Sequence, residues 1–180
     1  MSKILVISTS LRNDSNSECM AWEFAKGARD NGCEVETITL RDYPNIAFCK
    51  GCLACQKLSC CVINDDAIVI AEKMLNADAI CFATPIYYYS MSGQMKTLLD
   101  RCNSLYCSDY KFRNVYLLMS AAEDDANTPE KTITALQGWI ECFEKATLMG
   151  CVFAGGVSDA GDVSGHKALA ESYTLGNSAE

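Results

Sequence analysis

The sequence predicts a three-layer α/β fold in which helices cover both faces of a five-stranded parallel sheet. Apolar runs alternate with helical patterns about five times along the 180 residues, which is enough chain for one substantial core. The runs are continuously apolar, as is typical of strands buried on both faces. Right-handed crossovers leave few topologies, and five strands favour the order 2-1-3-4-5. In that order a ligand lies at the carboxyl ends of the strands, beside the switch point.

The first strand-helix unit begins with the apolar run from Ile4 to Ile7, which is long enough for a buried strand. After a polar turn, Ser17 is the predicted N-cap of a helix, and Asn31 with Gly32 supplies its end. The apolar residues of this helix recur at helical spacing: Met20, Ala21, Phe24, Ala25 and Ala28.

The turn from Ser8 to Ser17 has the composition of a phosphate site. The first amides of a helix lack intrahelical partners, and the helix dipole adds partial positive charge there. Hydroxyls and amides of the turn can wrap a phosphate, with Arg12 as a charged partner. The turn contains neither G-x-G-x-x-G nor G-x-x-x-x-G-K-[ST], which argues against a dinucleotide seat and against a P-loop. The alternative is an ordinary loop that caps the helix, because capping uses the same residue types.

The second unit contains an unusually long connection. Residues Glu34 to Leu40 alternate between apolar and polar, which predicts a strand near a sheet edge. The segment from Arg41 to Asp66 holds five cysteines, and connections of this length are usually functional. No linker or repeat marks a second domain. We therefore expect one domain over residues 1–180, with a cysteine-rich insertion at about 43–66.

The middle of the chain predicts a helix over Ala67–Asn76 and a buried strand over Ala79–Thr84, which Pro85 should end because proline cannot donate to the ladder. Ser92 is the expected cap of the next helix. Between them lie three successive tyrosines, at 87–89. Their faces offer a flat apolar wall for a planar conjugated ring, and their hydroxyls keep a wet edge. The alternative is that the tyrosines pack on a neighbouring subunit.

The last third predicts a strand over Val115–Met119, a helix with Pro129 at its first position and a strand over Leu148–Val157. A short helix follows at about His166 to Leu175. His166 is the only histidine, and a lone histidine near a helix start is more often a cap or a surface residue than a catalyst. No catalytic Ser-His-Asp arrangement is therefore assigned. Three loops should converge at the carboxyl edge of the sheet: Ser8–Ser17, Thr84–Ser92 and Ser120–Asn127.

Four cysteines of the insertion have the spacing C-x-x-C-x-x-C-x5-C: Cys49, Cys52, Cys55 and Cys61. Two overlapping C-x-x-C steps close to a fourth thiol suit a [4Fe–4S] cluster, whose irons need thiolates from several directions. Structural zinc more often uses two pairs set well apart. Free or redox-active thiols are the other alternative, and Cys60 is a spare that can substitute for Cys61 as the fourth ligand.

The charge and the cysteine count limit the compartment and the partners. Met1-Ser2-Lys3 leads straight into a strand and no apolar run is long enough to span a bilayer, so we expect a cytoplasmic protein with no signal peptide and no membrane partner. In a reducing compartment the 12 cysteines are not expected to form a disulfide framework. The net charge of -8 argues against nucleic acid as the main partner.

Several stretches of the chain resemble one known group. LVISTSLRNDSNS and ATPIYYYSMSGQMKTLLDR resemble the NADPH-dependent FMN reductases of the flavodoxin-like superfamily. Between them, CKGCLACQKLSCCVINDD resembles the compact cysteine motif of the iron-sulfur flavoproteins within that group. The later GVSDAGDVSGHKALAESYTLG is similar to the closing strand, loop and helix of the family.

This resemblance implies a flavodoxin-like three-layer sandwich that binds FMN, and it implies the residues of the site. The FMN phosphate would be held by Ser10, Arg12, Asn16 and Ser17. The ribityl chain and ring would lie against Thr84, Pro85, Ile86, Tyr87 and Tyr88. Ser120 and Ala121 would approach the ring edge, and Cys49, Cys52, Cys55 and Cys61 would be the metal ligands. The chain departs from the family at Thr9-Ser10-Leu11, where Gly-Ser-Pro is common, and at Tyr89, where a small residue is common.

The expected function is that of an FMN-dependent oxidoreductase, with NAD(P)H as co-substrate. Electrons would pass through FMN to a quinone, free flavin, another small acceptor or an iron-sulfur cluster. The alternative is an iron-sulfur flavoprotein electron carrier that works with ferredoxin-type partners and has no NAD(P)H activity; a third is an α/β module without flavin. No essential acid or base is assigned, since the cofactor carries the chemistry. In the resembling family the ring often sits at a dimer interface, so we expect a homodimer or homotetramer.

Overall fold

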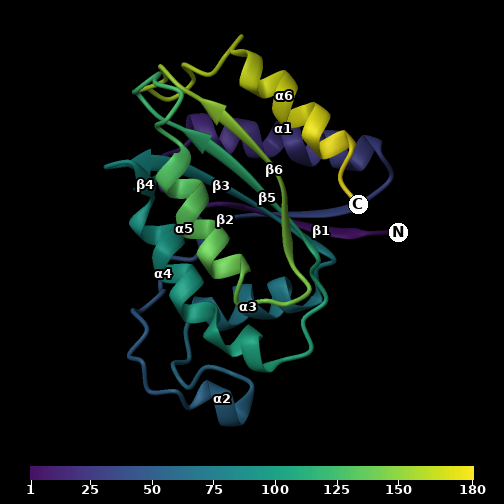
Figure 1. The fold of residues 1–180 in the computed structure, drawn as a ribbon, viewed down its shortest axis with the longest axis vertical. Helices are drawn as coiled ribbons and strands as arrows, with labels where there is room; N and C mark the ends of the chain where they lie inside the picture. Colours follow the sequence, from purple (N-terminus) through teal and green to yellow (C-terminus); the bar gives the residue numbers. More distant parts are fainter.

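The computed structural model describes all residues, 1–180, and its strands and helices alternate as the sequence predicts (Figure 1). Five strands are parallel: β1 (Lys3–Ser8), β2 (Glu34–Thr39), β3 (Ala79–Tyr87), β5 (Asn114–Ser120) and β6 (Thr147–Ala154). They run in the order β2-β1-β3-β5-β6, and a short antiparallel strand β4 (Ser90–Met91) pairs with β3. Among the parallel strands this is the order 2-1-3-4-5, so the predicted flavodoxin-like topology is confirmed.

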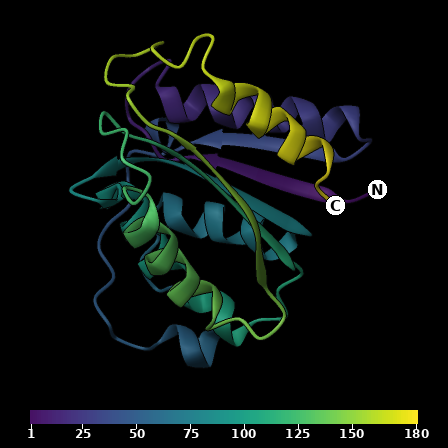
Figure 2. The same ribbon diagram turned by 45° about the horizontal axis from the view of Figure 1, so that its top comes forward.

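Helices lie on both faces of the sheet (Figures 1 and 2). Helices α1 (Asn16–Asp30) and α6 (Lys167–Asn177) pack on each other over one face. The other face carries α3 (Asp66–Asn76), α4 (Gly93–Arg101) and α5 (Glu130–Ile140). Three shorter helices lie in connections: η1 (Leu40–Asp42), α2 (Cys55–Leu58) and η2 (Cys102–Cys107). None of the helices combines the length and the apolarity that crossing a bilayer requires.

The alternation of side chains along β1 shows how the two faces are filled. Leu5 and Ile7 belong to a cluster of 24 buried residues that packs beneath α3, α4 and α5. Ile4 and Val6 belong to a cluster of 18 buried residues beneath α1 and α6. Successive strand side chains point to opposite faces, so a continuously apolar run fills both cores.

Two glycines allow α6 to lie against α1. A Cβ on Gly27 would meet the Tyr173 carbonyl oxygen and lie 2.8 Å from the Asn177 amide nitrogen. A Cβ on Gly176 would meet the Phe24 carbonyl oxygen. This close approach fixes α6, and therefore the loop before it, over the start of α1.

The structure corrects the predicted cap of the first helix. Ser15, not Ser17, is the N-cap, with extended backbone and a hydroxyl that accepts from the Glu18 amide. The sequence offers several capping residues in a row here. The helix starts at Asn16, before the predicted cap Ser17, and the Asn16 side chain bonds to the loop before α6.

The structure also corrects the role of Pro85, because β3 continues through it to Tyr87. The ladder with β1 ends at Ala83, whereas the ladder with β5 continues to the pair of Pro85 with Ser120. The proline therefore lies where β3 has a parallel neighbour on one side only, a position that tolerates a missing donor. Pro129 was predicted at the first position of its helix, but it is the N-cap residue that precedes α5.

Candidate cofactor site

A hollow of about 170 Å³ lies at the carboxyl edge of the sheet and is shared by four loops. It is called the cofactor hollow below. Its walls include eight of the residues predicted to bind FMN: Ser10, Arg12, Asn16, Pro85, Ile86, Tyr87, Ser120 and Ala121. The remaining lining residues are Ser15, Ala122, Val157 and Ser158. A water molecule occupies about 30 Å³ in the liquid, so the hollow has room for a phosphate group.

The loop between β1 and α1 places cationic and hydrogen-bonding groups around this hollow. The Ser10 hydroxyl accepts from the Arg12 amide at 3.2 Å, and the Arg12 guanidinium donates to the Ser158 carbonyl at 2.9 Å. The amides of Asn16 and Ser17 open α1 and have no intrahelical acceptor. Partial positive charge at this helix start and the Arg12 cation therefore face the same space, as an anion site requires.

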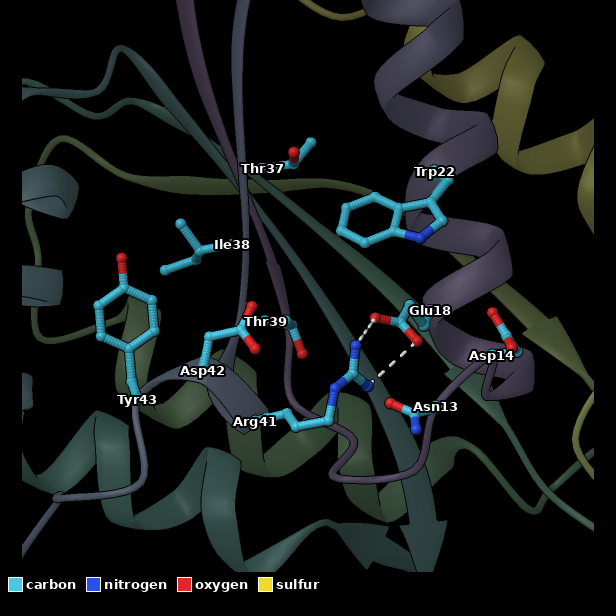
Figure 3. Close-up of a pocket in the computed structure, with 10 residues that line it drawn as sticks. All are labelled: Asn13, Asp14, Glu18, Trp22, Thr37, Ile38, Thr39, Arg41, Asp42 and Tyr43. Carbon is cyan, nitrogen blue, oxygen red and sulfur yellow. Dashed lines mark hydrogen bonds and ion pairs between the residues drawn. The ribbon is translucent and has the colours of Figure 1, made fainter.

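Arg41 and Glu18 support the loop from behind, and the sequence analysis missed both. Figure 3 shows the Arg41 guanidinium bound directly to the Glu18 carboxylate, and both side chains line an open groove of about 790 Å³. The two groups approach to 3.0 Å, and Arg41 also donates to the Arg12 carbonyl at 2.9 Å. The hydrogen bond to Glu18 raises the pKa of Arg41 above its ordinary value. An acidic residue in the first turn of a helix, together with an arginine after an edge strand, is the signal that could have found the pair.

The tyrosine loop is a tight hairpin between β3 and β4. Tyr88 and Tyr89 occupy its two turn positions with φ of 50° and 62°. These left-handed conformations favour glycine and asparagine, so two tyrosines there carry backbone strain. Tyr87 lines the cofactor hollow, Tyr88 is fully exposed, and the Tyr89 ring lies 5.3 Å from the Lys131 ammonium. Only one of the three tyrosines therefore reaches the hollow.

Two of the predicted FMN residues besides Tyr88 do not line the hollow. Thr84 is buried, and its hydroxyl accepts from the Ser92 amide and donates to the Pro85 carbonyl, both at 3.0 Å. It therefore fixes the hairpin to the start of α4. Ser17 is also buried, and its hydroxyl has no hydrogen-bond partner.

A fourth loop, at residues 155–166, completes the hollow, although the sequence analysis did not assign it there. The Ala121 amide donates to Ala154 and the Val157 amide donates to Ala121, both at 2.9 Å, which joins this loop to the one after β5. A Cβ on Gly155 would meet the carboxylate of Asp124, so only glycine fits this crossing. The pair Gly155-Gly156 at a strand end was the available signal.

The four predicted metal ligands line a second, much smaller hollow beside α2, on the outer side of the α3–α5 layer (Figures 1 and 2). This four-thiol hollow (Cys49, Cys52, Cys55 and Cys61) measures about 30 Å³. Left-handed residues at Gly51, Leu53 and Ser59 turn the chain around it. Cys60 is exposed and lines a different hollow.

The thiols match an iron-sulfur cluster in number and type. The four thiols line one hollow, but no three His, Cys, Asp or Glu side chains converge closely enough to ligate a single metal ion. Donors lie against two of the sulfurs, because Arg101 Nη2 is 3.4 Å from Cys61 Sγ and Asn103 Nδ2 is 3.1 Å from Cys55 Sγ. Cys102 is different: burial raises its pKa to about 12, so this thiol stays protonated in the core.

The sheet order, the hydroxyl-rich loop before the first helix and the hollow at the carboxyl edge define a flavodoxin-like α/β protein. Residues 2–154 match the family described as NADPH-dependent FMN reductase. The chain therefore belongs to this family of FMN-dependent oxidoreductases.

Relatives in sequence include an "Iron-sulfur flavoprotein" of Methanosarcina thermophila, which is 34% identical over 77% of this chain and 72% of its own length. Another, from Archaeoglobus fulgidus, is 38% identical over 62% of this chain and 54% of its own length. A putative NAD(P)H-dependent FMN-containing oxidoreductase of Bacillus subtilis is 30% identical over 55% of this chain and 51% of its own length. This chain thus matches only about half the length of the last two.

Solved structures resemble the whole chain in fold. An NAD(P)H:quinone oxidoreductase from Methanothermobacter marburgensis has a TM-score of 0.76 at 16% identity, over 98% of this chain and 96% of its own. An azoreductase from Bacillus anthracis has a TM-score of 0.71 at 16% identity, over 98% of this chain and 99% of its own. At such identities the likeness concerns the fold.

Proposed function

We propose that this protein binds FMN in the cofactor hollow and transfers electrons from NAD(P)H to a small acceptor or to a cluster in the four-thiol hollow. The observation that carries the proposal is the convergence of Ser10, Arg12 and Asn16 with the Pro85–Tyr87 stretch in one hollow at the switch point. The name of the Bacillus subtilis relative supports NAD(P)H as the donor, and those of the archaeal relatives support a cluster.

Different residues of the cofactor hollow would bind different parts of FMN. Arg12 and the first amides of α1 would bind the phosphate, and the loops after β3 and β5 would orient the flavin ring against Tyr87. Bound FMN would supply the redox chemistry, since a flavin accepts a hydride and returns two electrons. The chain then needs only to bind FMN, to orient its ring and to exclude water from it, so no side chain has to act as an acid or base.

The test is anaerobic mixing of the FMN-loaded protein with NADPH or NADH while the flavin absorbance band is followed. Rapid bleaching is expected with at least one of the two nucleotides. The matched variant is Arg12→Ala, which should weaken FMN binding by about tenfold or more because a charge-assisted bond to phosphate is lost. Its affinity for riboflavin, which lacks the phosphate, should be unchanged. Equal loss for both flavins would place the phosphate elsewhere.

The second candidate is an electron carrier without NAD(P)H activity, favoured by the four thiols around one hollow and by the net charge of -8. It predicts no bleaching with either nucleotide but fast reduction by a reduced ferredoxin. Anaerobic purification with iron and sulfide assays then tests whether the four-thiol hollow binds a cluster. Less than about one iron atom per chain would overturn the proposed cluster.

We also propose a homodimer or homotetramer, supported by the exposure of Tyr88 at the tip of a strained hairpin. Light scattering after gel filtration of the FMN-loaded protein tests this. A mass of one chain, about 19.7 kDa, would overturn it.

A further inference from the structure

Arg101 ends α4, and its side chain is fully buried. The two Nη atoms donate to both oxygens of Asp65, at 2.6 and 2.8 Å. They also donate to the carbonyls of Ala47 and Ile63, at 2.8 and 3.1 Å. Burying a guanidinium is costly unless it is paired and hydrogen-bonded, and here these four acceptors surround it.

These contacts close the base of the cysteine segment. Ala47 lies just before the first cysteine of the motif, and Ile63 lies just after the last. The Asp65 carboxylate also accepts from the Ala47 amide at 2.9 Å, and the Asp66 carboxylate accepts from the Asn45 amide at 2.9 Å. One side chain from α4 thus binds both arms of a loop that otherwise contains one four-residue helix.

The same guanidinium distinguishes two adjacent cysteines. Its Nη2 is 3.4 Å from Cys61 Sγ, and both residues line the four-thiol hollow. Cys60 makes no such bond and does not line the four-thiol hollow; it lines a neighbouring hollow, which Cys61 and Arg101 also line. We propose that Arg101 is the positioning residue of the four-thiol hollow, and that it selects Cys61 over Cys60 as fourth ligand and offsets the negative charge of the thiolates. This inference rests on the proposed cluster.

The charge argument has a definite sign. Four thiolates around an iron-sulfur cluster leave a net negative charge, and reduction adds another electron. A buried cation next to one of these sulfurs favours the reduced state and therefore raises the potential, as do hydrogen bonds to the sulfurs. The Arg101 Nε–H is buried without an acceptor, so one further donor of this guanidinium is free to interact with an anion.

Asn103 provides a milder contact of the same kind. Its Nδ2 donates to Cys55 Sγ at 3.1 Å from an exposed position on η2. Removing this amide leaves Arg101 and the closed base of the loop intact. The Asn103→Ala variant therefore changes one sulfur contact without the folding risk of a substitution in the core.

The test compares Arg101→Gln, Arg101→Lys and Asn103→Ala with the wild type after anaerobic reconstitution. Iron per chain, the rate of iron loss to a chelator and the cluster midpoint potential by EPR are measured, with bound FMN as the control for folding. Arg101→Gln should lose iron about tenfold faster than the wild type. Its midpoint potential should be lower by at least about 59 mV, which corresponds to a tenfold change in a one-electron equilibrium constant. Arg101→Lys should recover part of both. Asn103→Ala should shift the potential in the same direction by less.

Asp65→Asn separates an electrostatic role from a structural one. It removes a negative charge beside the guanidinium and should therefore raise the cluster potential, opposite to the decrease expected for Arg101→Gln. If Arg101 had a purely structural role, the two variants would shift the potential in the same direction. Unchanged iron loss and potential in Arg101→Gln would overturn the inference. So would a cluster that survives Cys61→Ser but is lost in Cys60→Ser.

The failure of the proposed cluster gives a different result. In that case the wild type itself takes up no iron and sulfide, while FMN binding is intact. Amide hydrogen exchange over residues 45–66 then tests the role of Arg101 in holding the loop. Exchange should rise about tenfold or more in Arg101→Gln and not in Asn103→Ala, and equal exchange in all three proteins would overturn that role.

Discussion

The side-chain amide of Asn16 donates to the backbone carbonyl of Asp159 at 2.9 Å, across 143 residues of sequence. Its carbonyl oxygen accepts from the Val163 amide at 3.1 Å. One residue at the start of α1 therefore connects the first loop of the cofactor hollow to the last. The shape of the cofactor hollow depends on this connection as well as on the hydroxyls and amides of the first loop.

Asn16→Asp should weaken FMN binding by at least tenfold. The change removes the donor to Asp159 and places a carboxylate near the expected phosphate, where like charges repel. Fluorescence titration with FMN and with riboflavin measures the effect, and riboflavin should lose less affinity because it carries no phosphate. An equal loss for both ligands would mean that the variant acts only by loosening the last loop.

Gly27→Ala should destabilise the protein by about 1–3 kcal/mol, because the added methyl group would collide with the backbone of α6. Urea unfolding measures the free energy. The matched control is Gly138→Ala in α5, where a Cβ would meet nothing within 4 Å. That control should stabilise the helix by up to about 1 kcal/mol, because alanine has the higher helix propensity. Similar effects at the two sites would contradict the close approach of α1 and α6.

Replacing Tyr88-Tyr89 by Asn-Gly should raise the free energy of unfolding by about 1–2 kcal/mol. Asparagine and glycine accept the left-handed conformations that the two tyrosines are forced to adopt. The same variant should lower the rate of flavin reduction or the oligomeric mass if the strained hairpin contacts a ligand or a second subunit. If stability rises while the rate of flavin reduction and the oligomeric mass stay unchanged, the strained hairpin contacts neither a ligand nor a second subunit.

The stability of the protein should fall in acid partly through Asp65. Burial alone would raise the pKa of this carboxyl group, but the hydrogen bonds from Arg101 and Ala47 outweigh it and hold the pKa below its ordinary value. A carboxyl group with a lowered folded pKa stabilises the protein above its unfolded value of about 3.9 and loses this contribution as the pH falls through the folded value.

Urea unfolding between pH 7 and pH 3 tests this pH dependence. Asp65→Asn should cost about 3 kcal/mol at pH 7, because it leaves a buried cation unpaired. Its stability should also fall less than that of the wild type at the acid end. Glu171→Gln, in the exposed pair with Lys167, is the control and should change the free energy by less than about 1 kcal/mol. Parallel pH curves for the wild type and Asp65→Asn would contradict the assignment.

The local pattern of the sequence was sufficient for the architecture and for much of the candidate site. Continuous apolar runs such as Ile4–Ile7 determine buried parallel strands, because both faces of the strand must find a core. Composition and turn chemistry also marked the Ser8–Ser17 loop and the hairpin, whose residues line the cofactor hollow together. The predicted cap Ser92 is confirmed, and His166, expected as a cap or a surface residue, caps α6.

Contacts between distant segments were decided only by the tertiary structure. Arg41 beside the loop between β1 and α1, Ser158 in the cofactor hollow and Arg101 against Cys61 each meet partners 29 or more residues away. No local period in the sequence records such a pairing. Pro85 failed as a strand end for the same reason, since the length of the neighbouring strand determines whether a missing donor matters. Sequence pattern therefore selected the elements, and packing selected which of their side chains meet.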